Sequence, residues 1–127
     1  MTPFAFVFPG QGSQSVGMLD AWGEHPAVRA TLDEASQAVG KDLARLIREG
    51  PKEVLDLTAN TQPVMLAAGV ACYRAWRAEG GAEPAAVAGH SLGEYSALVV
   101  AGVLSLADAM PLVRFRAQAM QEAVPVG

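Results

Sequence analysis

The sequence predicts an α/β fold, in which a parallel sheet is flanked by helices. Two short apolar runs, residues 4–8 and 85–88, are typical of buried strands, and helical patterns separate them. The second run leads into a glycine-rich turn at residues 89–93, and a helix-compatible run follows that turn. Because two strands are identified, we expect the sheet to be incomplete in this chain.

The first elements follow from apolar spacing and from helix-end signals. Residues 4–8 are continuously apolar and rich in β formers, so we expect a strand that is covered on both faces. A loop follows at residues 9–14. Pro26 opens the first helix, which Gly40 can close. Four apolar residues share one face of that helix: Val28, Leu32, Ala35 and Val39.

Three further helices are expected. The first covers residues 42–49 and stops at the Gly-Pro pair that follows. A longer one begins near the Gln-Pro pair at residues 62–63, with Thr61 or Gln62 as its cap, and ends at residues 80–81. The last opens with a capping box at Ser105 and runs to about residue 123.

The composition excludes some classes of binding partner and indicates the cellular compartment. The formal net charge is −4 and the nine Lys and Arg residues are scattered, which argues against nucleic acid as a partner. We identify no targeting segment and no apolar run long enough to span a membrane. The single cysteine, Cys72, excludes an internal disulfide and is interpreted as a buried structural thiol. We therefore expect a cytoplasmic protein.

Ser91 is the candidate nucleophile. It stands in Gly-His-Ser-Leu-Gly at residues 89–93, and the strand before and the helix after match the context of a nucleophile elbow. Such a turn exposes the serine hydroxyl, and the Leu92 N–H at the start of the following helix can stabilise an oxyanion. The alternative is an ordinary serine on a glycine-rich turn, which the flanking strand and helix disfavour.

The loop after the first strand is the candidate second side of the site. In an open parallel sheet, ligands bind outside the carboxyl ends of the strands. If the two strands are close in the sheet, the loop around Gln11 faces Ser91 and can supply a second backbone donor. Taken alone, the Gly-Gln-Gly segment at residues 10–12 is interpreted as a flexible turn.

Taken together, the motifs resemble one enzyme family. The blocks FPGQGSQ at residues 8–14, TQP at 61–63 and GHSLGEY at 89–95 precede Arg116 and MQEA at 120–123. This order and spacing is similar to that of bacterial malonyl-CoA:acyl carrier protein transacylases. It is also similar to the acyltransferase domains of polyketide and fatty acid synthases. The resemblance covers essentially the whole chain.

The resemblance implies roles for single residues. Ser91 would be acylated, the N–H groups of Gln11 and Leu92 would form the oxyanion hole, and Arg116 would bind the malonyl carboxylate as a two-pronged ion pair. Without the resemblance, Arg116 is interpreted as a solvated helix arginine, and Arg114 keeps that interpretation.

Three more side chains are given supporting or structural roles. Gln62 would support the pocket. His90 adjoins Ser91 on a sharp turn, so its ring should diverge, and we interpret it as a pocket-wall residue and not as the base. His25, at a helix start, is expected on the surface.

For the complete enzyme the resemblance implies ping-pong transfer of malonyl from malonyl-CoA to the phosphopantetheine thiol of acyl carrier protein in fatty acid biosynthesis. No permanently bound cofactor and no metal is expected. Alternatives are an acyltransferase domain of polyketide biosynthesis, a serine esterase or thioesterase, and an inactive fragment that merely folds or binds coenzyme A or a partner.

The catalytic histidine marks a departure from the family. The family's histidine lies well downstream of the serine, and no histidine follows Ser91 in this chain. We therefore expect residues 1–127 to be the N-terminal part of the large, α/β-hydrolase-like subdomain, without the rest of that core or the small ferredoxin-like subdomain. Alone, this part should be inactive.

Overall fold

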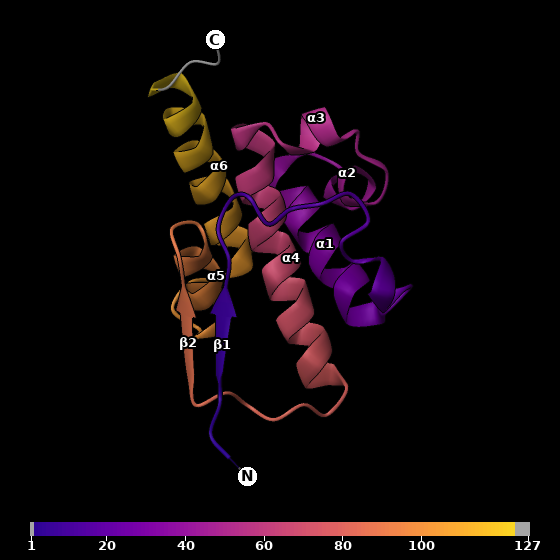
Figure 1. Cartoon of the computed structure of the whole chain (residues 1–127), viewed down its shortest axis with the longest axis vertical. Coiled ribbons are helices and arrows are strands. Elements are labelled where there is room, and N and C mark those ends of the chain that lie inside the picture. The colour runs from indigo at the N-terminus through magenta and orange to yellow at the C-terminus, as the bar shows by residue number, and fades with distance from the viewer. Residues whose placement is uncertain (1, 124–127) are drawn as a thin grey trace.

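The computed structural model describes residues 2–123, and its sheet consists of two parallel strands. Strand β1 (Ala5–Phe8) pairs with β2 (Ala86–Gly89), with Ala5 opposite Ala86 and Phe8 opposite Gly89. Figure 1 shows the strands lying side by side and pointing the same way, with their carboxyl ends together. The two strands are neighbours in the sheet, so the condition under which the loop around Gln11 faces Ser91 is met.

The segment between the strands is helical. It contains a short 3₁₀ helix η1 (Asp20–Trp22), followed by α1 (Pro26–Val39), α2 (Leu43–Glu49) and α3 (Lys52–Leu55). Helix α1 begins and ends as expected, with Gly40 in the left-handed conformation after its last residue. Helix α3 was not expected, because four residues are too few to show an apolar period.

Helix α4 (Thr58–Ala78) begins earlier than the sequence indicates. Thr61 and Gln62 lie inside the helix, so the expectation that one of them caps it is wrong. A capping hydroxyl accepts from backbone N–H groups, whereas the Thr61 hydroxyl donates to the carbonyls of Leu55 (2.5 Å) and Leu57 (3.0 Å). The side chain thus ties α4 to the turn before it.

Two helices follow the second strand, α5 (Gly93–Val100) and α6 (Leu106–Ala123). The Ser105 hydroxyl accepts from the Asp108 N–H at 3.1 Å, as the capping motif predicts. Helix α4 runs through the centre of the molecule and packs against α1, α5 and α6 (Figure 1). No helix within residues 2–123 is both long and apolar enough to cross a bilayer.

One face of the sheet is uncovered. The side chains of Phe6 and Phe8 point toward α4, where Phe6 meets the ring of Tyr73. The alternate residues point the other way, and Val7 is 74% exposed. The expectation of strands covered on both faces is therefore wrong for the described part of the chain, in which all the helices that touch the sheet lie on the Phe6 side.

His25 is also placed differently from the expectation. Its Nδ1 accepts from the Ala27 N–H at 3.1 Å, and its Nε2 lies 2.7 Å from an oxygen of Glu79. The side chain is 13% exposed, so the expectation of a surface residue is wrong. The ring caps α1 and bridges to the end of α4, which is a structural use of the imidazole.

Candidate active site

Ser91 occupies the sharp turn between β2 and α5. Its backbone φ is +55°, the sole positive φ of a non-glycine residue within residues 2–123. Such a conformation costs free energy and persists where the surroundings impose it. Here the turn is held by bonds from the His90 N–H to the Phe8 carbonyl (3.2 Å) and from the Gly93 N–H to the His90 carbonyl (2.9 Å). Strand, strained turn and helix together form an elbow with Ser91 at its exposed tip.

Close contacts with backbone atoms require glycine at both Gly89 and Gly93 of the elbow. A Cβ on Gly89 would lie 1.9 Å from the carbonyl oxygen of Gly93, and a Cβ on Gly93 would lie 2.1 Å from that of Phe8. Both contacts involve backbone, which cannot turn aside as a side chain does. The motif spacing in the sequence therefore reflects the packing of α5 directly onto the ends of β1 and β2.

The loop after β1 lies against the elbow. A Cβ on Gly10 would come within 2.9 Å of the His90 carbonyl oxygen, 3.6 Å of the Ser91 Cβ and 3.7 Å of the Leu92 nitrogen. Gln11 is the next residue, so its backbone enters the site beside Leu92. Within residues 2–123, neither the Gln11 N–H nor the Leu92 N–H donates a hydrogen bond. Both are thus available to an oxyanion.

Side chains fix this loop to the start of α4. The Gln11 side-chain amide donates to the Thr58 hydroxyl at 3.0 Å. Gln14 accepts from the Gly12 N–H at 2.8 Å and donates to a carboxylate oxygen of Asp56 at 2.9 Å. Bonds from Lys52 and Gln14 lower the pKa of the Asp56 carboxyl. The two glutamines of the PGQGSQ block therefore hold the loop from its two ends.

Arg116 meets Ser91 from helix α6. Its Nη2 donates to the Ser91 Oγ at 3.1 Å, and its Nη1 donates to the Gln62 side-chain oxygen at 2.5 Å. Gln62 is 1% exposed and lies on α4, with its amide nitrogen 3.3 Å from the Met120 sulfur. The structure thus brings together three residues that the sequence analysis singled out separately.

The charge of Arg116 is unpaired within the described residues. Arg116 is half-buried, and no carboxylate of residues 2–123 lies within ion-pair distance of its guanidinium. By contrast, Arg74 pairs with Glu34 at 3.1 Å. A partly desolvated guanidinium with free donors is a site for an anion, and its fork matches a carboxylate.

Arg114 points elsewhere, as expected. Its Nη1 donates to the Val39 carbonyl at 2.6 Å, at the last turn of α1. The side chain is half-buried and fastens α6 to α1, so its interpretation as a freely solvated residue is wrong. Two arginines two positions apart on α6 thus face different elements, and Arg116 is the one that reaches Ser91.

His90 lies beside the elbow without joining the group around Ser91. Its residue is exposed, and it lines a hollow with Val7, Phe8, Pro9, Ala88 and Gly89. Within residues 2–123, no imidazole nitrogen forms a hydrogen bond with the Ser91 Oγ. The described residues therefore present a hydroxyl, a cation and two N–H groups, and no base is placed to take the serine proton.

One residue of this group, Tyr95, was not predicted from the sequence. Its ring lies on the guanidinium of Arg116, with 5.5 Å between the Arg116 Cζ and the ring centroid. Tyr95 lies in the first turn of α5, four residues after Ser91, and the turn at Ser91 leads directly into that helix. This spacing was the signal in the sequence, but it does not reveal that α6 supplies a cation there.

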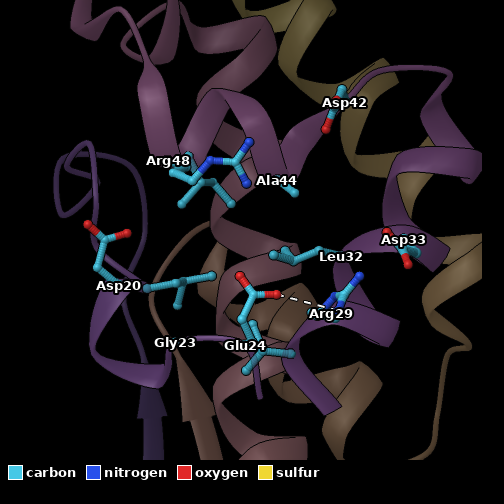
Figure 2. A pocket seen from close by; sticks show the side chains of 12 residues that line it. Asp20, Gly23, Glu24, Arg29, Leu32, Asp33, Asp42, Ala44 and Arg48 are labelled. Carbon is cyan, nitrogen blue, oxygen red and sulfur yellow. Dashed lines mark ion pairs between the residues drawn. The ribbon is translucent and has the colours of Figure 1, made fainter. Parts of the chain in front are cut away.

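A separate cavity of about 400 Å³ lies between η1, α1 and α2. Figure 2 shows its carboxylates, among them Asp20, Glu24 and Asp42, around two arginines. Arg29 pairs with Glu24 at 3.4 Å, and Asp42 caps α2 by accepting from the Arg45 N–H. No group of three or more His, Cys, Asp or Glu within residues 2–123 is placed to hold a metal ion. This cavity shares no lining residue with the site at Ser91.

The family of the chain follows from comparison with known proteins. The family model described as acyl transferase domain matches residues 5–127, nearly the whole chain. The chain belongs to the acyl transferase domain family. Gln11, Ser91 and Arg116 all lie within the matched residues, and the family agrees with the resemblance in the sequence.

Relatives and solved structures agree with this assignment. Over 100% of its own length, the acyl transferase chain is 59% identical to the malonyl CoA-acyl carrier protein transacylase of Escherichia coli K12. It matches the acyl-carrier-protein S-malonyltransferase structure of Burkholderia pseudomallei 1710b with a TM-score of 0.95 and 67% identity over 99% of the chain. A malonyl-transacylase solved in complex with its type II PKS acyl-carrier protein matches with a TM-score of 0.93 and 54% identity over 99% of the chain.

These matches cover part of each relative. The acyl transferase chain spans 41% of the Escherichia coli protein, and it also covers 41% of each of the two solved chains. The neighbours therefore share the α/β fold of the described residues within larger chains.

Proposed function

We propose that this chain carries the nucleophile and the carboxylate-binding group of a malonyl-CoA:acyl carrier protein transacylase of fatty acid biosynthesis. The bond of 3.1 Å between the Arg116 Nη2 and the Ser91 Oγ carries the proposal. It places an unpaired cation next to an exposed hydroxyl at a strained elbow. A thioester whose acyl group ends in a carboxylate fits both groups at once.

The first half-reaction forms a malonyl-serine ester. The Ser91 Oγ attacks the thioester carbonyl of malonyl-CoA, the N–H groups of Gln11 and Leu92 hold the developing oxyanion, and Arg116 holds the free carboxylate. The carbon–sulfur bond then breaks and coenzyme A leaves as the thiol. A serine at its ordinary pKa is a weak nucleophile, so a base must take its proton.

The second half-reaction returns the serine. The phosphopantetheine thiol of acyl carrier protein attacks the ester, the malonyl thioester forms, and Ser91 regains its proton. A relative solved with its acyl-carrier protein supports this choice of acceptor. We propose that the protein holds no permanent cofactor, because coenzyme A and the phosphopantetheine of the carrier supply the thiols. We also propose that Gln62 supports the pocket and that His90 belongs to its wall.

We further propose that residues 1–127 form the N-terminal part of the large subdomain of a transacylase, and that the base and the small ferredoxin-like subdomain lie outside them. The chain spans 41% of the Escherichia coli relative, and within residues 2–123 no imidazole contacts Ser91, which supports this division. A cytoplasmic location fits the single cysteine and this chemistry. Nothing in the described geometry favours an esterase.

Mass spectrometry of the acyl-enzyme tests the proposal. The natively expressed protein, meaning the whole chain that the native gene encodes, is mixed with malonyl-CoA, quenched in acid and digested. We expect one malonyl group per chain on the peptide that contains Ser91, and none in the Ser91→Ala variant. A malonyl group on another residue would assign the nucleophile elsewhere, and the absence of any covalent adduct would contradict the covalent mechanism.

A further inference from the structure

Tyr95 holds the carboxylate-binding cation without taking part in any ion pair. The residue lies in the first turn of α5, four residues after Ser91, and its side chain is half-buried against the core. The Arg116 Cζ lies 5.5 Å from the centroid of its ring, within the range at which a guanidinium is attracted to an aromatic face. The ring thus forms one wall of the space in which the guanidinium sits.

The other contacts of the guanidinium are also neutral. Gln62 accepts from Nη1 at 2.5 Å, and the Ser91 hydroxyl accepts from Nη2 at 3.1 Å. A guanidinium has five N–H donors, so these two bonds leave others for a ligand. Within residues 2–123, the head of Arg116 is therefore positioned by an amide, a hydroxyl and a ring.

Neutral contacts have a consequence for anion binding. A carboxylate beside Arg116 would fix its position equally well, but it would neutralise the charge and occupy the donors that a ligand needs. An aromatic face attracts the cation through its quadrupole and leaves both the net charge and the N–H groups available. The ring therefore orients the cation without neutralising it or occupying its donors, and Gln62 occupies one donor without neutralising the charge.

We propose that Tyr95 is a positioning residue for acyl-group selectivity, acting through the guanidinium of Arg116. The inference rests on the proposed transacylase function, in which that guanidinium binds the malonyl carboxylate. Tyr95 favours substrates that carry a carboxylate, because it keeps the cation over the nucleophile before the substrate arrives. For acyl groups without a carboxylate, this positioning contributes nothing.

The contribution depends on the ring and not on the hydroxyl. Tyr95 is among the partly buried side chains that pack against the core, and its hydroxyl makes no hydrogen bond within residues 2–123. Phenylalanine at this position keeps both the packing and the aromatic face. Leucine keeps apolar volume and removes the face, which separates a positioning role from a purely structural one.

The test measures kcat/KM for malonyl-CoA and for acetyl-CoA in the natively expressed protein and in two variants. We expect Tyr95→Leu to lower the malonyl-to-acetyl ratio by about three- to thirty-fold. The loss should fall mainly on KM for malonyl-CoA, because the carboxylate is bound in both ground and transition states. Tyr95→Phe should keep the ratio within about twofold. Val99→Ala, one turn further along α5, is the packing control and should leave the ratio unchanged.

The outcomes separate this inference from the function on which it rests. A native protein with no preference for malonyl-CoA over acetyl-CoA would overturn both. A preference that survives in Tyr95→Leu, or an equal loss for the two substrates, would overturn the role of Tyr95 and leave that of Arg116 standing.

A second measurement does not depend on how the leucine variant folds. In ¹⁵N-edited NMR spectra of the native protein, the side-chain N–H protons of Arg116 should be shifted upfield by the ring current of Tyr95. Those of Arg114, which donates to the Val39 carbonyl, serve as the reference. An Arg116 signal at the position of exposed arginines would overturn the inference.

Discussion

The Nη2 of Arg116 lies 3.1 Å from the Oγ of Ser91, so a cation on α6 and a hydroxyl on the β2–α5 turn share one site. Gln62 fixes the other arm of the guanidinium from α4. An acyl group esterified to Ser91 therefore starts next to this cation. The proposed malonyl substrate, whose carboxylate is one methylene from its thioester carbonyl, offers one group to each of these residues.

Removal of the nucleophile should abolish covalent chemistry and leave the fold intact. Ser91→Ala deletes one exposed oxygen whose side-chain bond within residues 2–123 is to Arg116. We expect acyl-enzyme formation to fall to background by intact-mass measurement, with an unchanged melting temperature. Ser15→Ala, at another exposed serine, is the matched control and should keep full acylation. Substantial malonyl transfer by Ser91→Ala would refute the assignment.

The elbow should not accept a side chain at Gly89. A Cβ there would lie 1.9 Å from the Gly93 carbonyl oxygen, so the backbone of β2 or α5 must move. We expect Gly89→Ala to lower the free energy of unfolding by at least about 3 kcal/mol, measured by urea denaturation. Gly12→Ala is the control for backbone conformation alone. Its Cβ would meet nothing within 4 Å, so only the positive φ should destabilise the fold, by roughly 1–2 kcal/mol. Similar losses for both would argue against the steric account.

The sequence carried enough information to predict the elbow. The spacing of Gly89 and Gly93 around Ser91 is dictated by backbone contacts, and such contacts allow no substitute for glycine. The strand before and the helix after have strong local signals, an apolar run and an uninterrupted helical pattern. Where one local rule and one packing rule require the same residue, the prediction was correct.

Other features depend on contacts distant in the sequence. The Gln-Pro pair at residues 62–63 is typical of a helix start, yet tertiary packing buries it inside α4. The contact between Tyr95 and Arg116 joins two helices, and helical spacing on one of them does not identify the partner. The prediction of cover on both faces of the first strand was wrong within the described residues, where the sheet has two strands, because an apolar pattern does not identify what covers each face.

Cys72 should react slowly as a thiol. Burial raises the pKa of the Cys72 thiol, and a bond to Trp22 offsets part of that effect. A raised pKa means less thiolate at a given pH, so alkylation by iodoacetamide at pH 8 should be at least about fivefold slower than that of glutathione. The rate should rise as the pH increases further. A rate equal to that of glutathione at pH 8 would contradict the burial of this side chain.

The 127-residue chain by itself should not transfer malonyl groups to acyl carrier protein. Its two histidines are His25, which caps α1, and His90, which makes no bond to Ser91 within the described residues. Val7 and the uncovered face of the sheet are also exposed, which favours association. We expect no transfer in a carrier assay and a mass above that of a monomer in light scattering. A stable, active monomer would show that the base is His25 or His90.

The selectivity of an Arg116→Ala variant tests the central claim most directly, namely that Arg116 binds the acyl carboxylate beside Ser91. Transfer of malonyl and acetyl groups is measured in the natively expressed protein and in the variant. We predict a loss of about 2–4 kcal/mol in malonyl transfer, which is the scale for removing one partner of a desolvated ion pair, and acetyl transfer that is preserved or improved. An equal loss for malonyl and acetyl groups would contradict the claim.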